Sequence, residues 1–137
     1  MKLGVCLEMF FTKMPFAERI MQAGDAGFKS AEMWLIEGKQ PEQIAKIARR
    51  AGVTLTNAVI GSPDGKIGGG LTDPRRRKEW LKRTERTLAF CQAAGIGACI
   101  VCTGNVIPGK TRAAMLRSVV DGLKATAEKA EAAGIEL

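Results

Sequence analysis

Four segments of the sequence end in the same way, with an Ala-Gly pair followed by an apolar residue. A stretch with amphipathic, helical spacing precedes each pair, and a short apolar stretch typical of a strand follows it. Glycine suits this junction because many helices end in a left-handed turn. The junctions are Ala26–Phe28, Ala51–Val53, Ala94–Ile96 and Ala133–Ile135. The repeat predicts a chain in which strands and helices alternate four times.

The helices that precede these junctions have recognisable starts. Proline favours the first position of a helix, so Pro15, Pro41 and Pro74 mark three starts, with Asp73 as the N-cap of the third. The fourth helix is expected to begin near Thr111. The apolar stripes of the four helices are expected to be buried. They are Phe16, Ile20, Met21 and Gly24; Ile44, Ile47, Ala48 and Ala51; Trp80, Leu81, Thr84, Leu88 and Cys91; and Leu116, Val119, Val120, Leu123, Ala127 and Ala130.

The predicted strands are residues 2–7, 30–35, 53–60 and 98–102, and right-handed crossovers make successive strands parallel. Residues 134–137, "GIEL", are typical of the start of a fifth strand. Four β/α units in 137 residues are about half of the roughly 250 residues of a (β/α)8 barrel. We therefore predict an α/β fold, the N-terminal half of a TIM barrel, with an open flavodoxin-like parallel sheet as the alternative.

Residues 1–137 are expected to form a single domain fragment with no internal boundary. Half a barrel leaves inward-facing side chains in water, so it needs a partner that covers them. The expected partner is a missing C-terminal half or a second copy of the chain, and a homo-oligomer is predicted. No apolar stretch approaches the roughly 20 residues of a membrane span, so we expect no membrane partner and a cytoplasmic location.

The net charge of +7 is concentrated between Pro74 and Arg86, "PRRRKEWLKRTER". Six basic residues of this run spread over the side of the third predicted helix that lies opposite its apolar stripe. This arrangement predicts a solvated outer face. No aromatic residues that could stack on bases are interleaved, so a nucleic-acid partner is not expected. The basic residues are Arg75, Arg76, Lys78, Lys82, Arg83 and Arg86.

The four cysteines are expected to be free thiols in a reducing compartment, because three of them lie in predicted buried strands. Cys99 and Cys102 have the spacing of a redox or zinc pair. An odd separation along a strand points two side chains to opposite faces, which argues against both interpretations. The other two cysteines of the chain are Cys6 and Cys91.

Gly104 to Thr111 spells G-x-x-x-x-G-K-T, the pattern of a nucleotide-binding P-loop. A P-loop holds phosphates with successive backbone N–H groups, and Pro108 has none. The glycines usual inside such a loop are replaced by Val106 and Ile107, and no neighbouring predicted strand ends in an Asp for Mg²⁺. The match is therefore interpreted as a coincidence, and a nucleotide-binding module is kept as an alternative function.

The Gly-rich stretch Ile60–Asp73 matches no phosphate-binding pattern. It follows the third predicted strand, at the end of a barrel where substrates enter. Two interpretations remain open, a mobile lid and a plain flexible connection.

Four segments carry a resemblance to a known family: "AGFKSAEMW" at 26–34, "GGGLTDPRRRKEWL" at 68–81, "LAFCQAAGI" at 88–96 and "VIPGKTR" at 106–112. Together the chain resembles the xylose isomerase-like barrels, and within them the hydroxypyruvate isomerase-like sugar isomerases and epimerases. The resemblance implies proton transfer through an enediolate on a hydroxy-carbonyl substrate, with Mn²⁺, Mg²⁺ or Co²⁺ as the metal. It also places both proton-transferring glutamates and the metal ligands on strands five to eight. No catalytic residue or metal ligand is therefore expected in this chain, and the first such Glu is expected just after Leu137.

The resemblance implies that this half of the barrel contributes substrate-facing residues at the C-terminal ends of its strands. Trp34 is interpreted as a barrel-rim hydrophobe or as a surface for a sugar carbon chain, and Glu32 as a residue that orients its neighbours. Asn57 stands where related enzymes carry a His, which leaves the substrate open. The chain has no His, which argues against the zinc endonucleases of the superfamily. The candidate substrate-binding residues are Glu8, Glu32, Trp34, Asn57, Thr103 and Asn105.

Overall fold

The computed structural model describes residues 3–137, and in it strands alternate with four α-helices. A strand with a break in it takes the place of the third predicted strand, and a short 3-10 turn precedes the third helix. In chain order the elements are β1 (Gly4–Cys6), α1 (Phe16–Asp25), β2 (Ser30–Glu32), α2 (Pro41–Ala51), β3 (Thr54–Leu55), β4 (Asn57–Ile60), η1 (Pro74–Arg76), α3 (Arg77–Ala94), β5 (Ala98–Val101) and α4 (Arg112–Ala133).

Every strand pair within residues 3–137 is parallel, in the ladders β1-β2-β3 and β4-β5. The two ladders join because Met33 N donates to Asn57 O at 3.1 Å and Val59 N donates to Trp34 O at 2.7 Å. At the far edge Ala98 forms a parallel bridge with Glu136. The parallel α/β fold is therefore confirmed, and the predicted fifth strand appears as this single bridge.

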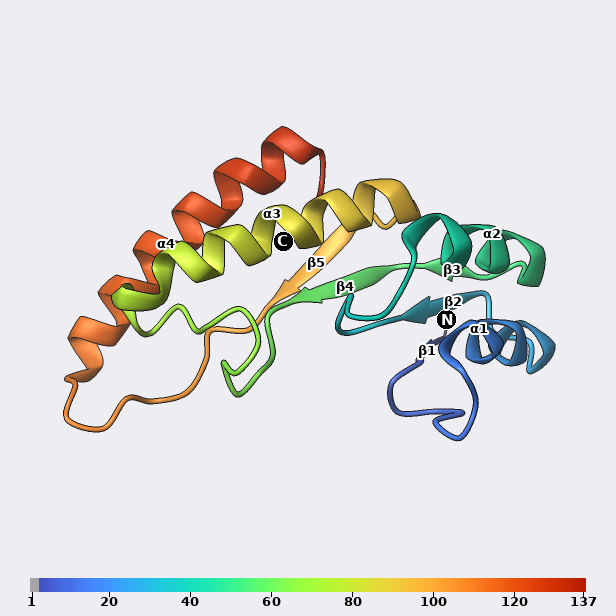
Figure 1. The fold of residues 1–137 in the computed structure, drawn as a ribbon, viewed down its shortest axis with the longest axis horizontal. Helices are drawn as coiled ribbons and strands as arrows, with labels where there is room; N and C mark the ends of the chain where they lie inside the picture. Colours follow the sequence, from blue (N-terminus) through green and yellow to red (C-terminus); the bar gives the residue numbers. More distant parts are fainter. Residues whose placement is uncertain (1–2) are drawn as a thin grey trace.

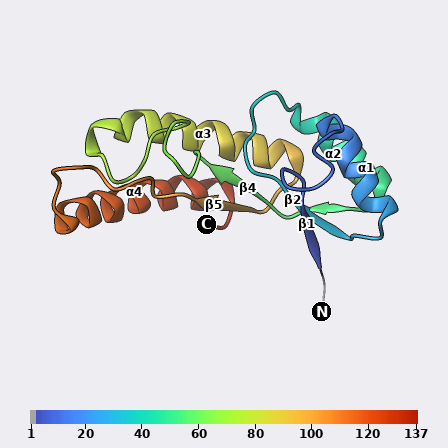
Figure 2. The ribbon, with the colours of Figure 1, turned by 90° about the horizontal axis from the view of Figure 1, so that it is seen from below.

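The helices pack in two pairs. Figure 1 shows α1 with α2 at one end of the row of strands and α3 alongside α4 at the other, and the view from below in Figure 2 shows the same grouping. Among residues 3–137, no helix combines the length and the hydrophobicity needed to cross a membrane.

The predicted helix boundaries are correct to within a few residues. Gly52, Gly95 and Gly134 cap their helices with φ values of 66°, 71° and 67°. Thr111 is the N-cap of α4, and its Oγ1 accepts a hydrogen bond from Ala114 N at 3.2 Å. Asp73 accepts a hydrogen bond from Arg75 N at 3.1 Å, so it caps the 3-10 turn that leads into α3 instead of capping α3 itself.

The burial predicted for α3 is confirmed at Trp80, Thr84, Leu88 and Cys91, while Leu81 is partly buried against the core. The prediction for α4 is wrong at Leu116 and Val120, which are 52% and 49% exposed, and at Ala127. Small and polar residues face the core there, because α4 packs tightly against the loop before η1: a Cβ on Gly122 would sit 2.4 Å from Leu71 Cδ2. The prediction for α1 is wrong at Met21, which is exposed. The buried residues of this helix are Ile20 and Ala23. The buried residues of α4 are Met115, Ser118, Gly122, Thr126 and Ala130.

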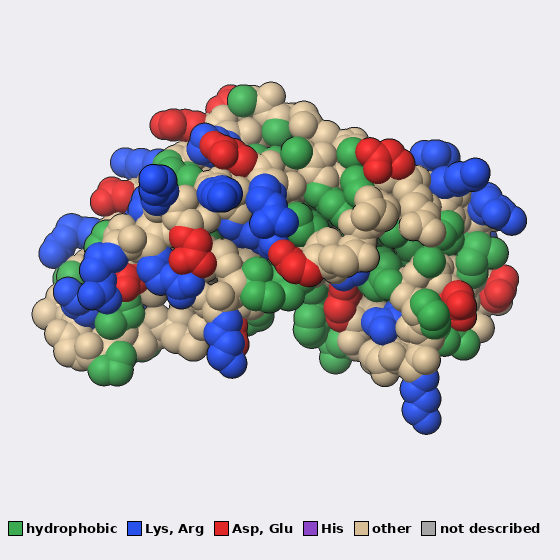
Figure 3. Space-filling model, viewed as in Figure 1, with side chains coloured by type: hydrophobic (Ala, Val, Ile, Leu, Met, Phe, Trp, Pro, Cys, Tyr) green, Lys and Arg blue, Asp and Glu red, His purple; other side chains and the backbone are tan. Residues whose placement is uncertain are grey.

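The basic face of α3 is solvated only in part. Figure 3 shows Lys and Arg side chains over this region with acidic side chains among them. Arg83 is the exception to the prediction, because its side chain is only 4% exposed and forms an ion pair with Glu37. Glu37 follows β2, and no helical pattern could place it opposite α3.

The third predicted strand is broken at Thr56, between β3 and β4. Thr56 N and Thr56 Oγ1 both donate to Ala31 O, at 2.9 Å and 3.2 Å. After this residue the chain pairs with β5, from Asn57 opposite Ala98 to Ile60 opposite Val101. Asn57 thus begins β4. The expectation that it lies at the carboxyl end of its strand is wrong.

Candidate functional site

A hollow of about 370 Å³ opens on the face of the ladder formed by β1, β2 and β3, which we call the strand wall. Cys6 lies directly opposite Glu32 in the β1–β2 ladder, so both side chains reach this hollow. Burial raises the pKa of the Cys6 thiol, and interaction with the Glu32 carboxylate raises it further. The site therefore places a thiol that resists deprotonation beside the Glu32 side chain. The lining residues are Gly4, Cys6, Phe10, Glu32 and Thr56.

Glu32 and Asn57 are the two candidates that the structure brings together. Asn57 Nδ2 lies 3.4 Å from Glu32 Oε2 and 3.3 Å from Thr56 Oγ1, and donates to both. Asn57 Oδ1 is buried and has no hydrogen-bond partner among residues 3–137. The hollow thus has a carboxylate held by a neighbouring amide, together with the Thr56 side chain, and these groups suit the hydroxyls of a small polar molecule.

Glu8 is engaged by a lysine. Its Oε1 lies 3.0 Å from Lys39 Nζ, and the two side chains are only 18% and 12% exposed. Lys39 also donates to Leu35 O and lies 4.3 Å from the centre of the Phe16 ring. Glu8 therefore serves an ion pair that joins the turn after β1 to the segment after β2. Sequence reasoning missed Lys39, because a single lysine in a loop has no pattern that predicts a partner.

Trp34 lies just beyond β2, with its side chain on the surface. The residue is 38% exposed, and its carbonyl accepts the bond from Val59 N that joins the two ladders. Its backbone therefore has a structural role. An indole surface remains open beside the strand end, which is compatible with both interpretations of this residue.

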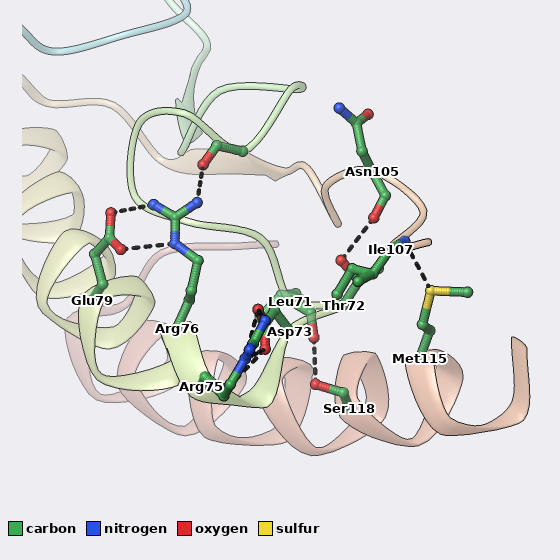
Figure 4. A network of polar contacts seen from close by, with 11 residues as sticks. Leu71, Thr72, Asp73, Arg75, Arg76, Glu79, Asn105, Ile107, Met115 and Ser118 are labelled. Atoms are coloured by element: carbon green, nitrogen blue, oxygen red, sulfur yellow. Dashed lines mark hydrogen bonds and ion pairs between the residues drawn. The ribbon is translucent and has the colours of Figure 1, made fainter. Parts of the chain in front are cut away.

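Thr103 and Asn105 belong to a second group, around the loop that precedes α3. Thr72 N donates to Thr103 O at 3.3 Å, Thr72 Oγ1 donates to Asn105 O at 2.9 Å, and Asn105 Nδ2 donates to Asp64 O at 3.4 Å. Figure 4 shows how Thr72 reaches Asn105 across the two loops. The hollow beside them, of about 190 Å³, is lined by Asp64, Gly65, Gly70, Thr72, Asp73, Arg76, Asn105, Val106, Ile107 and Pro108.

The loop between β4 and η1 is packed and hydrogen-bonded. Ser62 N donates to Ile67 O and Ile67 N donates to Ser62 Oγ, both at 2.9 Å. Arg76 Nη1 donates to Gly65 O at 2.7 Å while the same guanidinium pairs with Glu79 (Figure 4). Leu71 at its end is fully buried. These contacts fit a fixed connection better than a free lid.

The P-loop-like segment does not form a phosphate cradle. Ile107 N donates to Met115 Sδ at 3.3 Å, and Lys110 N donates to Ile107 O at 3.1 Å. Pro108 offers no N–H, and the Thr111 hydroxyl accepts the capping bond from Ala114. The amides and the hydroxyl that would meet a nucleotide are thus used within the loop or by α4.

The residues present do not fit a metal centre. Within residues 3–137, no three or more His, Cys, Asp or Glu side chains are grouped so that they could hold a metal ion. Of the two candidate acids, Glu8 is paired with Lys39 and Glu32 with Asn57.

Comparisons with known proteins find relatives that are named as isomerases. It is 29% identical over 141 aligned residues to the 2-oxo-tetronate isomerase of Pectobacterium atrosepticum, an alignment that covers 99% of this chain and 53% of that protein. It is 30% identical to a putative hydroxypyruvate isomerase of Streptomyces coelicolor, over 99% of this chain and 52% of that protein. The chain thus spans about half the length of the curated relatives it matches.

Solved structures show the same fold and the same half coverage. The solved structure of an AP endonuclease, family 2, from Brucella melitensis superposes with a TM-score of 0.86 at 20% identity, over 98% of this chain and 52% of that one. The half coverage agrees with the N-terminal half of a barrel. The family described as "Xylose isomerase-like TIM barrel" matches residues 20–137. The chain therefore belongs to the xylose isomerase-like TIM barrel family.

Proposed function

We propose that this chain supplies the N-terminal half of a barrel enzyme that isomerises or epimerises a small hydroxy-carbonyl substrate of the sugar or hydroxypyruvate type. The observation that carries the proposal is a polar hollow on the strand wall, lined by Glu32, whose carboxylate accepts a hydrogen bond from Asn57. The similarity to named isomerases over 99% of the chain supports the same reaction class.

In this proposal the wall binds and orients the substrate. The Glu32 carboxylate accepts hydrogen bonds from substrate hydroxyls, while Asn57 holds this carboxylate in place through its Nδ2. The Cys6 thiol stays protonated, because the pKa of this group is raised, so it does not compete as a nucleophile. With a carboxylate as the charged group of the hollow, the wall favours the hydroxyl-bearing end of a substrate over an anionic end.

The chemical step is proposed to lie outside these residues. The complete barrel enzyme, here called the parent-length protein, would use Mn²⁺, Mg²⁺ or Co²⁺. Its metal ligands and its two proton-transferring glutamates would come from further β/α units. Since residues 3–137 offer no metal-binding group of side chains, no step is assigned to them beyond binding and orientation.

A covering partner is part of the same proposal. β1 and the Ala98–Glu136 bridge are the outer positions of the described strand row, and unpaired strand edges invite association. Further β/α units or a second copy of the chain would cover them. Light scattering on the 137-residue chain measures this directly: a mass of two or more copies supports self-association, and a stable monomer argues against it.

The activity test uses the parent-length protein, a panel of small ketoses and hydroxypyruvate, and solvent D₂O. Exchange of a substrate C–H for deuterium with added metal is expected, and its absence across the whole panel contradicts the proposal. Glu32→Gln is expected to raise KM by roughly tenfold, about 1.4 kcal/mol of binding, with a smaller effect on kcat. Glu131→Gln, on the exposed side of α4, is the matched control and should leave both constants unchanged.

A further inference from the structure

Cys91 and Cys99 place two thiols against each other in the core. Cys91 lies in the last turn of α3 and Cys99 is the second residue of β5. Their Sγ atoms are 3.5 Å apart, and the residues are 0% and 3% exposed. A disulfide bond is about 2.05 Å long, so the two sulfurs need to approach by roughly 1.5 Å to bond.

The segment between the two cysteines has room for this movement. It contains Gly95, which caps α3, and Gly97. A Cβ added at either glycine would meet no atom within 4 Å. Both glycines are exposed, so their backbone can adjust next to solvent, while Ile96 between them stays buried in the core.

We infer that Cys91 and Cys99 are a disulfide-forming pair whose oxidant is a small peroxide. A peroxide suits the pair because a bulky disulfide reagent cannot reach two buried sulfurs. The product joins the end of α3 to β5, the strand that leads to Thr103 and Asn105. This reaction is independent of the proposed isomerase function.

The reaction balances in two steps. The Cys99 thiolate attacks one peroxide oxygen, so an S–O bond forms, the O–O bond breaks, and hydroxide leaves and becomes water with the Cys99 proton. The Cys91 sulfur then attacks the sulfenic sulfur of Cys99, so the S–S bond forms, the S–O bond breaks, and the hydroxyl leaves as water with the Cys91 proton. The two thiols lose two electrons and the peroxide is reduced to two waters.

The two sulfurs lie within hydrogen-bond distance, and either thiol can be the donor. Interaction with Cys91 lowers the pKa of Cys99, although burial acts against this, and interaction with Cys99 together with burial raises the pKa of Cys91. This difference in pKa favours Cys99 as the attacking thiol, and the same disulfide forms if the two roles are exchanged. Burial raises the pKa of Cys6 and of Cys102, which lowers their thiolate fraction and their reactivity.

The test begins with a Cys6→Ala/Cys102→Ala double variant, which retains only the buried pair, with its fold checked by circular dichroism. After peroxide treatment, unfolding and alkylation, the expected product lacks the mass of two hydrogens, carries no alkyl group and reverts with dithiothreitol. Adding Cys91→Ala to this background should abolish the reversible product. Two alkylated thiols, a gain of oxygen without a cross-link, or a disulfide-linked dimer would each overturn the inference.

The wild-type chain provides a second measurement that needs no substitution. Cys91, Cys99 and Cys102 lie in one tryptic peptide, residues 87–110. A Cys91–Cys99 bond should suppress backbone fragments between residues 91 and 99 while leaving those between 99 and 102. The opposite fragment pattern assigns the bond to Cys99 and Cys102 and contradicts the inference.

Discussion

Trp80 Nε1 donates a 2.8 Å hydrogen bond to Thr126 Oγ1, and this bond ties α3 to α4 inside the core. The same hydroxyl donates to Gly122 O at 2.7 Å, so it is fully used. Both Trp80 and Thr126 have no exposed surface. The contact explains why a polar residue, Thr126, lies on the buried face of α4.

The first prediction concerns this bond. Thr126→Val keeps the shape of the side chain but leaves the Trp80 indole N–H buried without an acceptor, which should lower the free energy of unfolding by about 1–3 kcal/mol. Urea unfolding followed by Trp fluorescence measures the change. Thr54→Val, at an exposed position of β3, should change stability by less than about 0.5 kcal/mol. Equal urea midpoints for the two variants would refute the assignment.

The second prediction concerns Gly122 of α4, which packs against Leu71 and the Arg77 side chain. Alanine normally stabilises a helix relative to glycine by about 1 kcal/mol. At Gly122, however, the new Cβ would sit 2.4 Å from Leu71 Cδ2 and 2.9 Å from Arg77 Cζ. Gly122→Ala is therefore expected to destabilise the chain by about 1–3 kcal/mol. Thermal unfolding checks this, with Gly97→Ala as the control because no atom lies within 4 Å of its added Cβ.

The third prediction concerns the Arg83–Glu37 ion pair and pH. Burial acts to raise the pKa of Glu37, but the bond and charge of Arg83 outweigh it and hold that pKa below its ordinary value of 4.5. A lowered pKa stabilises the fold above the unfolded-state value, and this stabilisation disappears as pH falls through the folded-state value.

Wild type should therefore be more stable than Glu37→Gln at pH 7, and the gap should close between about pH 5 and pH 3. Urea midpoints measured across this range give the difference directly. Glu128→Gln, at an exposed position of α4, should show no such closing gap. A gap that stays constant with pH would mean that the Glu37 charge does not act as proposed.

The fourth prediction concerns the nucleotide alternative. Titration of the chain with ATP or GTP and Mg²⁺ should give no saturable binding. The reason is that two loop amides are already used: Ile107 N donates to Met115 Sδ, and Lys110 N donates to Ile107 O. Lys110→Ala should leave the thermal midpoint unchanged, since this side chain is exposed. Saturable binding that Lys110→Ala abolishes would restore the nucleotide-binding interpretation.

Much of the fold was predictable, because it rests on local signals. The Ala-Gly junctions, together with Pro41 and Thr111, placed helix ends within a few residues, since capping depends on nearby backbone groups. The alternation of elements then predicted parallel pairing. The break at Thr56 was not predictable, because it depends on the Ala31 carbonyl of a neighbouring strand.

The candidate site was predicted only in part. Sequence position placed all six candidate residues at strand ends, but the structure divides them among separate neighbourhoods. Glu32 meets Asn57 on the wall, Glu8 meets Lys39, and Asn105 meets the loop before η1. Residue type and order along the chain contain no information on which loops fold back on one another.

The sequence by itself determined that strands and helices alternate, where each helix ends, and which family the chain resembles, because these properties follow from capping, periodicity and local motifs. Only the tertiary structure decided which face of α4 is buried, that Arg83 leaves the solvated run to pair with Glu37, and that Cys91 meets Cys99. Those outcomes depend on how closely distant segments approach. That distance is set by packing across the whole fold and not by any single stretch of sequence.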